Sequence, residues 1–205
     1  FKISVLKPII DALETLSGKT YESHTESMRV IADHMRAAVF LAVDGVVPSN
    51  TAQGYVMRRL MRRAIRFAFD LGVEQDLCEK IVPVVCELYR SDYPEVAESE
   101  EKVLEVMKRE ETAFRKTLRR GLQHFEKIAT VRFSEEFNAD SLQSDPARIE
   151  KPRLTGEDLF LLHDTYGFPL ELSKEEAYRR DYRIAINADQ EFDQLMDEQR
   201  ERSRT

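Results

Sequence analysis

The sequence is poor in glycine and proline, with seven of each in 205 residues. These residues interrupt helices and build the turns of β-sandwiches, so their scarcity favours long helices over a loop-rich β fold. No apolar run approaches the roughly 18 residues that a membrane-spanning helix requires. The first ten residues, FKISVLKPII, have the pattern of neither a secretory signal nor a transit peptide. The sequence therefore predicts a helical protein without a membrane partner.

Cysteine is scarce as well: only Cys78 and Cys86 are present, eight positions apart in an apolar stretch. A zinc site or a disulfide framework needs more ligands at defined spacings, so this pair is typical of buried thiols on a helix. Free thiols indicate a reducing compartment, and we expect a cytoplasmic protein, with an organelle as the alternative. The sequence also shows no nucleophile–base pair, metal triad or phosphate loop, so we expect no catalytic and no metal-binding residue in it.

Charge is abundant but unevenly distributed. Charged residues make up 34% of the chain, hydrophobic residues at 42% suffice for a core, and the net charge is −7. This balance excludes a protein that coats nucleic acid indiscriminately. Residues 45–69 nevertheless contain five arginines and no acid, whereas residues 91–111 contain eight acids against three bases. A basic segment thus lies within an acidic chain.

Apolar residues recur at helical spacing along most of the chain, which predicts an all-α fold with one long helix across residues 103–125. Pro83 should kink or split a helix that spans residues 77–88. Helix starts are expected where capping-box spacings occur, near Ser23, Asn50, Thr155, Ser173 and Asn187. Helix ends are expected at Gly18, at Gly72 and in the turn 164–169.

Periodicity is lost near residues 130–153, where we expect an irregular insertion or a small β excursion. The sequence therefore predicts a helical subdomain at 1–129, the insertion at 130–153, and a second helical subdomain at 154–205 packed on the first. The chain begins at Phe1 and stops at Thr205 inside a charged helical pattern. We accordingly expect it to be a piece of a longer protein.

The basic segment forms an amphipathic helix in which the arginines share an arc of about 140° with Tyr55. Two interpretations remain open. The arginines can pair with the acidic segment 91–111 packed alongside, as surface charges usually do. They can also hold phosphates, because guanidinium forks match phosphate oxygens and the segment contains no lysine. The five residues are Arg58, Arg59, Arg62, Arg63 and Arg66.

Five blocks carry a resemblance to a known family. They are RVIADHMR at 29–36, DGVVPSN at 44–50, GYVMRRLMRRA at 54–64, EETAF at 110–114 and LHDTYGFPLEL at 162–172. In this order they resemble the alanyl-tRNA synthetases, across nearly the whole chain. The sequence lacks that family's adenylate-forming motif and the histidine–cysteine zinc cluster of its editing domain. The resemblance therefore implies the helical middle domain that follows the catalytic core and receives the acceptor stem of tRNA(Ala).

The resemblance also implies two base-reading residues. By motif position, Asn50 and Asp164 correspond to the asparagine and aspartate that contact a G·U wobble pair in the acceptor stem, while the five arginines would grip phosphates. Taken alone, Asn50 is more often a helix cap and Asp164 a turn residue. The family usually has Glu-Gly-Arg or a similar triplet after the asparagine, and this chain has TAQ at 51–53. A positive charge beside the reader is therefore missing.

Other polar residues have simpler interpretations. Asp33 and His34 suggest a metal or acid–base pair, but Arg29 and Arg36 at helical spacing favour a surface ion pair. His163 is interpreted as structural, and Tyr166 and Phe168 as core anchors.

The functional prediction is a tRNA-recognition domain that lets the parent enzyme attach alanine to its tRNA. The resemblance implies ATP with magnesium, a catalytic core in the same chain and a zinc-bearing editing domain elsewhere in the parent, and no cofactor or activity in this piece alone. The alternative is a helical protein-interaction scaffold whose arginine helix pairs with acidic segments.

Overall fold

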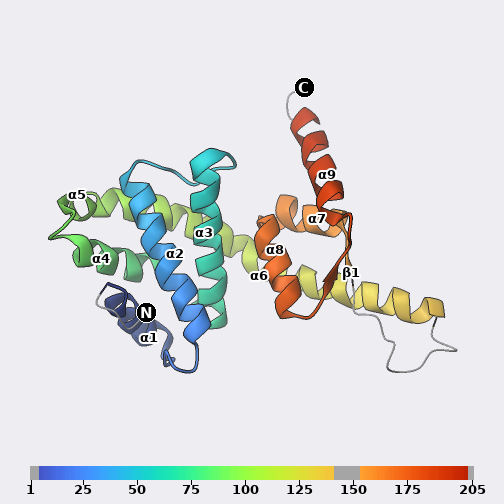
Figure 1. Ribbon diagram of the computed structural model, residues 1–205, viewed down its shortest axis with the longest axis horizontal. Coiled ribbons are helices and arrows are strands. Elements are labelled where there is room, and N and C mark those ends of the chain that lie inside the picture. Colours follow the sequence, from blue (N-terminus) through green and yellow to red (C-terminus); the bar gives the residue numbers. More distant parts are fainter. Residues whose placement is uncertain (1–4, 141–152, 203–205) are drawn as a thin grey trace. The chain divides into compact units, whose positions relative to one another are not determined.

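A computed structural model describes the backbone of residues 5–140 and 153–202, and the side chains of all of these except 129 and 131–140 (Figure 1). The predicted all-α fold is confirmed, since the strands in the described ranges amount to one two-residue pair. In chain order the elements are α1 (Lys7–Ser17), α2 (Thr25–Val43), α3 (Ala52–Asp70), α4 (Leu77–Tyr89), α5 (Pro94–Glu98), α6 (Glu100–Asp140), β1 (Arg153–Leu154), α7 (Gly156–Tyr166), α8 (Leu170–Arg179), β2 (Arg183–Ile184) and α9 (Ala188–Arg202).

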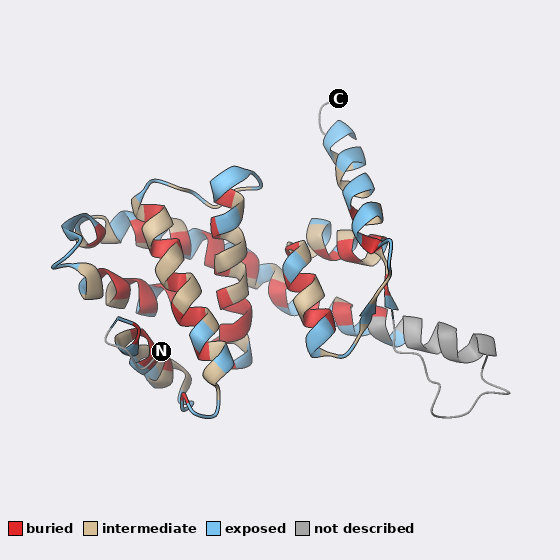
Figure 2. Cartoon of the chain, in the orientation of Figure 1, coloured by how far each residue is buried: buried red, intermediate tan, exposed pale blue. Residues whose placement is uncertain are grey.

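The chain divides into two compact units, Phe1–Lys116 and Thr117–Thr205, with the division inside α6. In the first unit, α2 and α3 pack against each other, and α4 packs against α1 and α2. The facing stripes are apolar and buried, as Figure 2 shows in red. Their largest fully buried side chains are Ile9, Leu13, Met28, Ile31, Met35, Met57, Met61, Ile65 and Phe67.

The second unit is built on the later part of α6. The turn after α7 packs onto it: Thr117 Oγ1 donates to the Tyr166 carbonyl oxygen at 2.7 Å, and Phe168 is fully buried. A Cβ at Gly121 would overlap the Phe168 ring, so the close approach requires a glycine there. Tyr166 lies half-buried against the His124 ring, at 5.1 Å between centroids. The prediction that both aromatic residues anchor this turn is confirmed.

Several predicted helix ends are confirmed. Gly18 ends α1 and Gly167 ends α7, each in the left-handed region that glycine adopts without steric cost. Thr155 and Asp158 form the predicted capping box at the start of α7. Helix α4 is not split at Pro83, because six of its side chains are buried and their packing outweighs the lost backbone hydrogen bond.

The predicted start of α2 near Ser23 is confirmed, since the helix begins at Thr25, but its predicted capping box is wrong, as is the predicted start of α8. Helix α2 has His24 at its N-cap without a side-chain bond, because the Ser23 hydroxyl bonds within the preceding turn, to Thr20. Helix α8 begins at Leu170, since Pro169 supplies a suitable backbone angle just before it, and Ser173 is therefore buried inside the helix.

Helix α6 extends beyond the end predicted from periodicity. It continues to Asp140, because residues 130–140 contain neither glycine nor proline to interrupt it. Of the rest of the predicted insertion, residues 141–152 lie outside the described ranges. Arg153 belongs to β1, which pairs in parallel with β2.

Candidate nucleic-acid interface

The loop that carries Asn50 is held against the first turn of α3. Ser49 N donates to the Gly54 carbonyl oxygen at 3.1 Å, and Ser49 Oγ donates to the Thr51 carbonyl oxygen at 3.0 Å. Gly54 is buried, and a Cβ there would overlap both Ser49 Oγ and the Val47 carbonyl oxygen. Glycine at this helical position thus permits the close contact that fixes the loop.

Gly54→Ala should destabilise the first unit although alanine is the better helix former. Helix propensity contributes about 1 kcal/mol in favour of alanine, whereas overpacking costs about 1–3 kcal/mol. The backbone carbonyl of Val47 cannot rotate away, so we expect a net loss, measured by urea unfolding. Gln53→Ala, an exposed neighbour on the same helix, is the control and should change little. An increase in stability for Gly54→Ala would show that the loop is not packed as described.

Asn50 is exposed and does not cap α3. The N-cap residue is Thr51, again without a side-chain bond, so the predicted capping role is wrong. The reason is a competing partner: Asn50 Oδ1 accepts a hydrogen bond from the Arg58 guanidinium, which also donates to the Pro48 carbonyl oxygen at 3.2 Å. Within the described residues the amide nitrogen of Asn50 makes no hydrogen bond. The side chain therefore presents donors to solvent.

Asp164 lies in the last turn of α7 and is exposed. One of its carboxylate oxygens accepts from Gln199 Nε2 of α9, and Oδ2 makes no hydrogen bond in the described part of the chain. A carboxylate is unfavourable near the carboxyl end of a helix, where the helix dipole is negative. Asp164 is therefore not explained by helix stability. It belongs to the second unit and Asn50 to the first, and each is oriented within its own unit.

Two of the five arginines pair with a single buried carboxylate. Arg62 Nε donates to Glu110 Oε1 at 2.7 Å, and Arg58 Nε lies 3.4 Å from Glu110 Oε2. Glu110 is only 8% exposed and the Arg62 side chain 14% exposed. The Arg62 guanidinium also lies over the Phe114 ring at 5.1 Å, and burial lowers its pKa below that of free arginine despite the carboxylate. For these two residues, pairing with the acidic segment 91–111 is confirmed.

Arg66 does not face solvent. Its side chain is 4% exposed and pairs with Asp70 one turn later on α3. The prediction that Arg66 contacts phosphate has no support in this conformation. The side of α3 that carries Arg66 packs against the core, as its buried neighbours Ile65 and Phe67 show.

Arg59 and Arg63 are half-buried. The Arg59 guanidinium lies 6.0 Å from the centre of the Tyr55 ring. Arg63 donates to His34 Nε2 at 2.8 Å, and His34 Nδ1 lies 3.3 Å from Asp33 Oδ2.

The Asp33 region forms ion pairs, as predicted, with one difference. Asp33 Oδ1 lies 3.6 Å from the Arg36 guanidinium. Arg29 does not join this pair but donates to the Tyr21 hydroxyl at 2.8 Å. His163 contacts the Phe192 ring, in keeping with a structural role.

The described residues show neither a metal centre nor a membrane-spanning helix. These residues contain no group of three or more potential metal ligands and no helix long and apolar enough to cross a bilayer. Cys78 and Cys86 are buried free thiols, as predicted. Burial raises the pKa of Cys86 to about 11. Burial also raises the pKa of Cys78 well above its usual range, and the Glu111 carboxylate adds to this shift. Neither residue therefore supplies a thiolate nucleophile near neutral pH.

No sequence pattern identifies three residues that position the candidate site. Glu110 was one acid among eight in its segment, and its contacts with Arg58 and Arg62 distinguish it from the others, including its buried neighbour Glu111. Gln199 lies 35 residues after Asp164, and no spacing rule connects them. Gly54 follows Ser49 by five residues, and a loop contact of this kind has no short-range pattern.

The chain is similar to known proteins over its whole length. The family model described as tRNA synthetases class II (A) matches residues 1–205. Proteins named alanine–tRNA ligase are 38% identical over 204 residues in Shouchella clausii, 39% over 208 residues in Halalkalibacterium halodurans and 40% over 206 residues in Streptococcus agalactiae. Each alignment covers all of this chain but only 21–22% of the relative. The chain thus spans about a fifth of the length of these relatives.

Proposed function

We propose that this chain, which belongs to the alanyl-tRNA synthetases, a family of class II tRNA synthetases, reads a G·U wobble pair in the acceptor stem of tRNA(Ala). One observation carries the proposal: each candidate reader is exposed, with one polar atom held by a neighbouring side chain. Arg58 holds the oxygen of Asn50, and Gln199 holds one oxygen of Asp164. Such positioning fixes which atoms remain for an RNA ligand.

The remaining atoms suit a wobble pair. Base edges of A-form RNA are accessible in the shallow minor groove, and a G·U pair leaves the guanine exocyclic amine there without its usual partner. The second oxygen of Asp164 can accept from that amine, whereas the amide nitrogen of Asn50 can donate to a base or ribose oxygen. The two side chains therefore offer complementary hydrogen bonds, one acceptor and one donor.

Phosphate contacts would set the register of the stem. Among the five arginines, the proposal assigns this role to the half-buried Arg59 and Arg63, because Arg66 is buried and Arg62 pairs with the buried Glu110. Arg58 serves the site in another way, by orienting Asn50.

Arg59→Ala and Arg63→Ala should each weaken binding to every stem alike. Each should also reduce the slope of log affinity against log salt concentration by about the contribution of one phosphate contact. The measurement is fluorescence anisotropy with an RNA minihelix across a series of salt concentrations. Arg109→Ala is the control, since Arg109 is an exposed arginine of α6 outside the arginine helix. Salt-independent affinity of the wild-type chain would contradict the phosphate contacts.

The parent protein would attach alanine to tRNA(Ala). In this proposal ATP with magnesium serves a catalytic core of the same polypeptide, and a zinc-bearing editing domain lies elsewhere. The proposal assigns RNA binding to this piece and catalysis to the rest of the parent protein. The buried free thiols support a reducing compartment, and we place the protein in the cytoplasm.

The alternative, a protein-interaction scaffold whose arginine helix pairs with acidic segments, is met in one respect only, because two of the arginines pair with the chain's own acidic segment. Arg58 and Arg62 already have a carboxylate partner within the chain, and Arg66 is buried. Their pairing with acid is internal and gives no reason to expect an acidic protein as the partner.

A further inference from the structure

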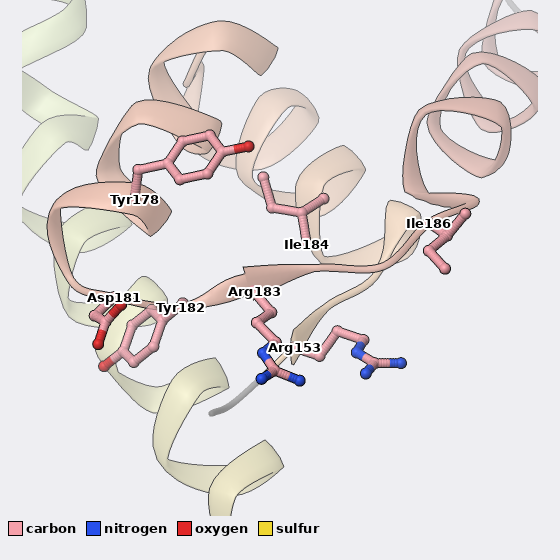
Figure 3. Close-up of a pocket in the computed structure, with 7 residues that line it drawn as sticks. All are labelled: Arg153, Tyr178, Asp181, Tyr182, Arg183, Ile184 and Ile186. Carbon is pink, nitrogen blue, oxygen red and sulfur yellow. The ribbon is translucent and has the colours of Figure 1, made fainter. Parts of the chain in front are cut away.

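The orientation of Asn50 depends on one arginine. Neither Asn50 nor Asp164 lines the cavity at the strand pair of the second unit, which Figure 3 shows. Asn50 is instead exposed on the first unit, where its Oδ1 accepts a hydrogen bond from Arg58 Nη1. Arg58 Nη2 donates to the Pro48 carbonyl oxygen at 3.2 Å, so both terminal nitrogens of the guanidinium hold the loop that precedes α3. The position of Arg58 therefore determines how Asn50 is presented.

The third nitrogen of this guanidinium faces α6. Arg58 Nε lies 3.4 Å from Glu110 Oε2, while the other carboxylate oxygen, Oε1, accepts from Arg62 Nε at 2.7 Å. The Glu110 side chain is only 8% exposed, whereas Pro48 is half-buried and Asn50 exposed. Charge pairs are stronger where water is excluded. Among the three partners of Arg58, the Glu110 carboxylate is therefore the one that holds it most firmly.

The planar guanidinium transmits the position of Glu110 to the loop. Its nitrogens form a rigid fork, so fixing Nε also fixes the directions in which Nη1 and Nη2 donate. A guanidinium has donors and no acceptor, so the atom of Asn50 that faces Arg58 is the amide oxygen. The amide nitrogen then faces away with both of its donors. Without Arg58 in this position, the exposed amide can turn over and present its oxygen equally well.

We propose that Glu110 is a positioning residue for base-pair recognition. It holds the Arg58 guanidinium where Arg58 binds the oxygen of Asn50, so that the amide nitrogen donates to the RNA. The proposal rests on the proposed function, in which Asn50 contacts the wobble pair. Glu110 is buried and does not touch the RNA itself, so it acts through Arg58 alone.

The competing interpretation is that Glu110 only fastens α3 to α6. Its loss would then lower stability without changing which stem is preferred. Glu111, the next residue of α6, offers a comparison because it is also buried, at 4% exposed. Its carboxylate accepts from the backbone nitrogens of Leu77 and Cys78 at 3.1 and 2.9 Å. Glu111 thus holds the first turn of α4, whereas Glu110 holds the arginine helix.

The test measures by fluorescence anisotropy how much more tightly the whole chain binds a G·U minihelix than a G·C minihelix. Circular dichroism checks that each variant is folded at the temperature used. Glu110→Gln should reduce this preference about fivefold, the lower end of the range for one base contact, because a neutral amide no longer fixes the guanidinium. Glu111→Gln is the matched control. It makes the same change in a buried carboxylate of the same helix and should keep the wild-type preference.

Arg58→Lys is the second variant, and it decides the question if Glu110→Gln does not fold. Lysine keeps the positive charge and can still pair with Glu110. Its ammonium lacks the planar fork and cannot hold three partners in fixed directions. Arg58→Lys should therefore reduce the preference for the wobble stem as well.

A cycle of single and double variants separates positioning from stability. In an Asn50→Ala background no amide remains to be oriented. Adding Glu110→Gln, or Arg58→Lys in its place, should then cause no further loss of preference, although it lowers stability as before.

The inference is overturned if Arg58→Lys or a folded Glu110→Gln keeps the wild-type preference. It is also overturned if Glu111→Gln reduces the preference as much as Glu110→Gln does, or if the loss persists in the Asn50→Ala background. With any of these results, a wild-type chain that prefers the wobble stem leaves the proposed function standing alone. Equal binding of both stems by the wild-type chain would contradict the proposed function and this inference with it.

Discussion

Glu110→Gln should destabilise the first unit by about 3–5 kcal/mol, the range for removing one partner of a buried ion pair. Glu110 is the shared partner of Arg58 and Arg62, and the Arg62 side chain is only 14% exposed. Glutamine keeps the size of the side chain but removes its charge, so the Arg62 guanidinium beside Phe114 loses the buried carboxylate that pairs with it. Urea unfolding monitored by circular dichroism measures the loss.

Glu105→Gln is the matched control for Glu110. It makes the same change on the same helix, in an exposed pair with Arg109 that contributes little because water screens it. Equal stability of the two variants would show that Glu110 does not hold the arginine helix in place.

Asp164→Ala should remove about 1–3 kcal/mol of discrimination between G·U and G·C stems, on the scale of a lost base contact in DNA recognition. The fold should tolerate the change, because a carboxylate in the last turn of a helix is unfavourable and alanine is a good helix former. Asn50→Ala should act in parallel and leave stability nearly unchanged, since Asn50 does not cap α3. Anisotropy with both stems and an unfolding curve for each variant separate recognition from stability.

Glu157→Ala serves as the control for Asp164. It removes an exposed acid from the other end of α7 and so keeps the net charge change the same. The Glu157→Ala variant should keep the wild-type discrimination between G·U and G·C stems. If Asp164→Ala weakens both stems equally, the carboxylate contributes to the overall charge of the surface and does not read the base pair.

The fold was largely predictable because helices and their buried stripes depend on local spacing. The stripe of Met28, Ile31 and Met35 is buried as its periodicity indicates, and the capping box at Thr155 forms because its two partners lie within one turn. Predictions failed where a local rule competed with another contact. Asn50 bonds to Arg58 eight residues away, which no capping pattern anticipates.

The candidate site was predictable in composition more than in arrangement. Periodicity showed that the arginines share a face but could not show which of them contact acid, because that depends on where α6 packs. The pairing of Arg153 with Arg183 could not be predicted from the sequence either, since the two strands lie 30 residues apart and are only two residues long.

Recognition of the wobble pair can be measured on the wild-type chain, as its affinity for two minihelices that differ only in a G·U or a G·C pair at one position of the stem. We expect tighter binding of the wobble stem, by about 1–3 kcal/mol or roughly 5- to 150-fold. Equal affinity for the two stems, at a salt concentration where both bind measurably, would contradict it.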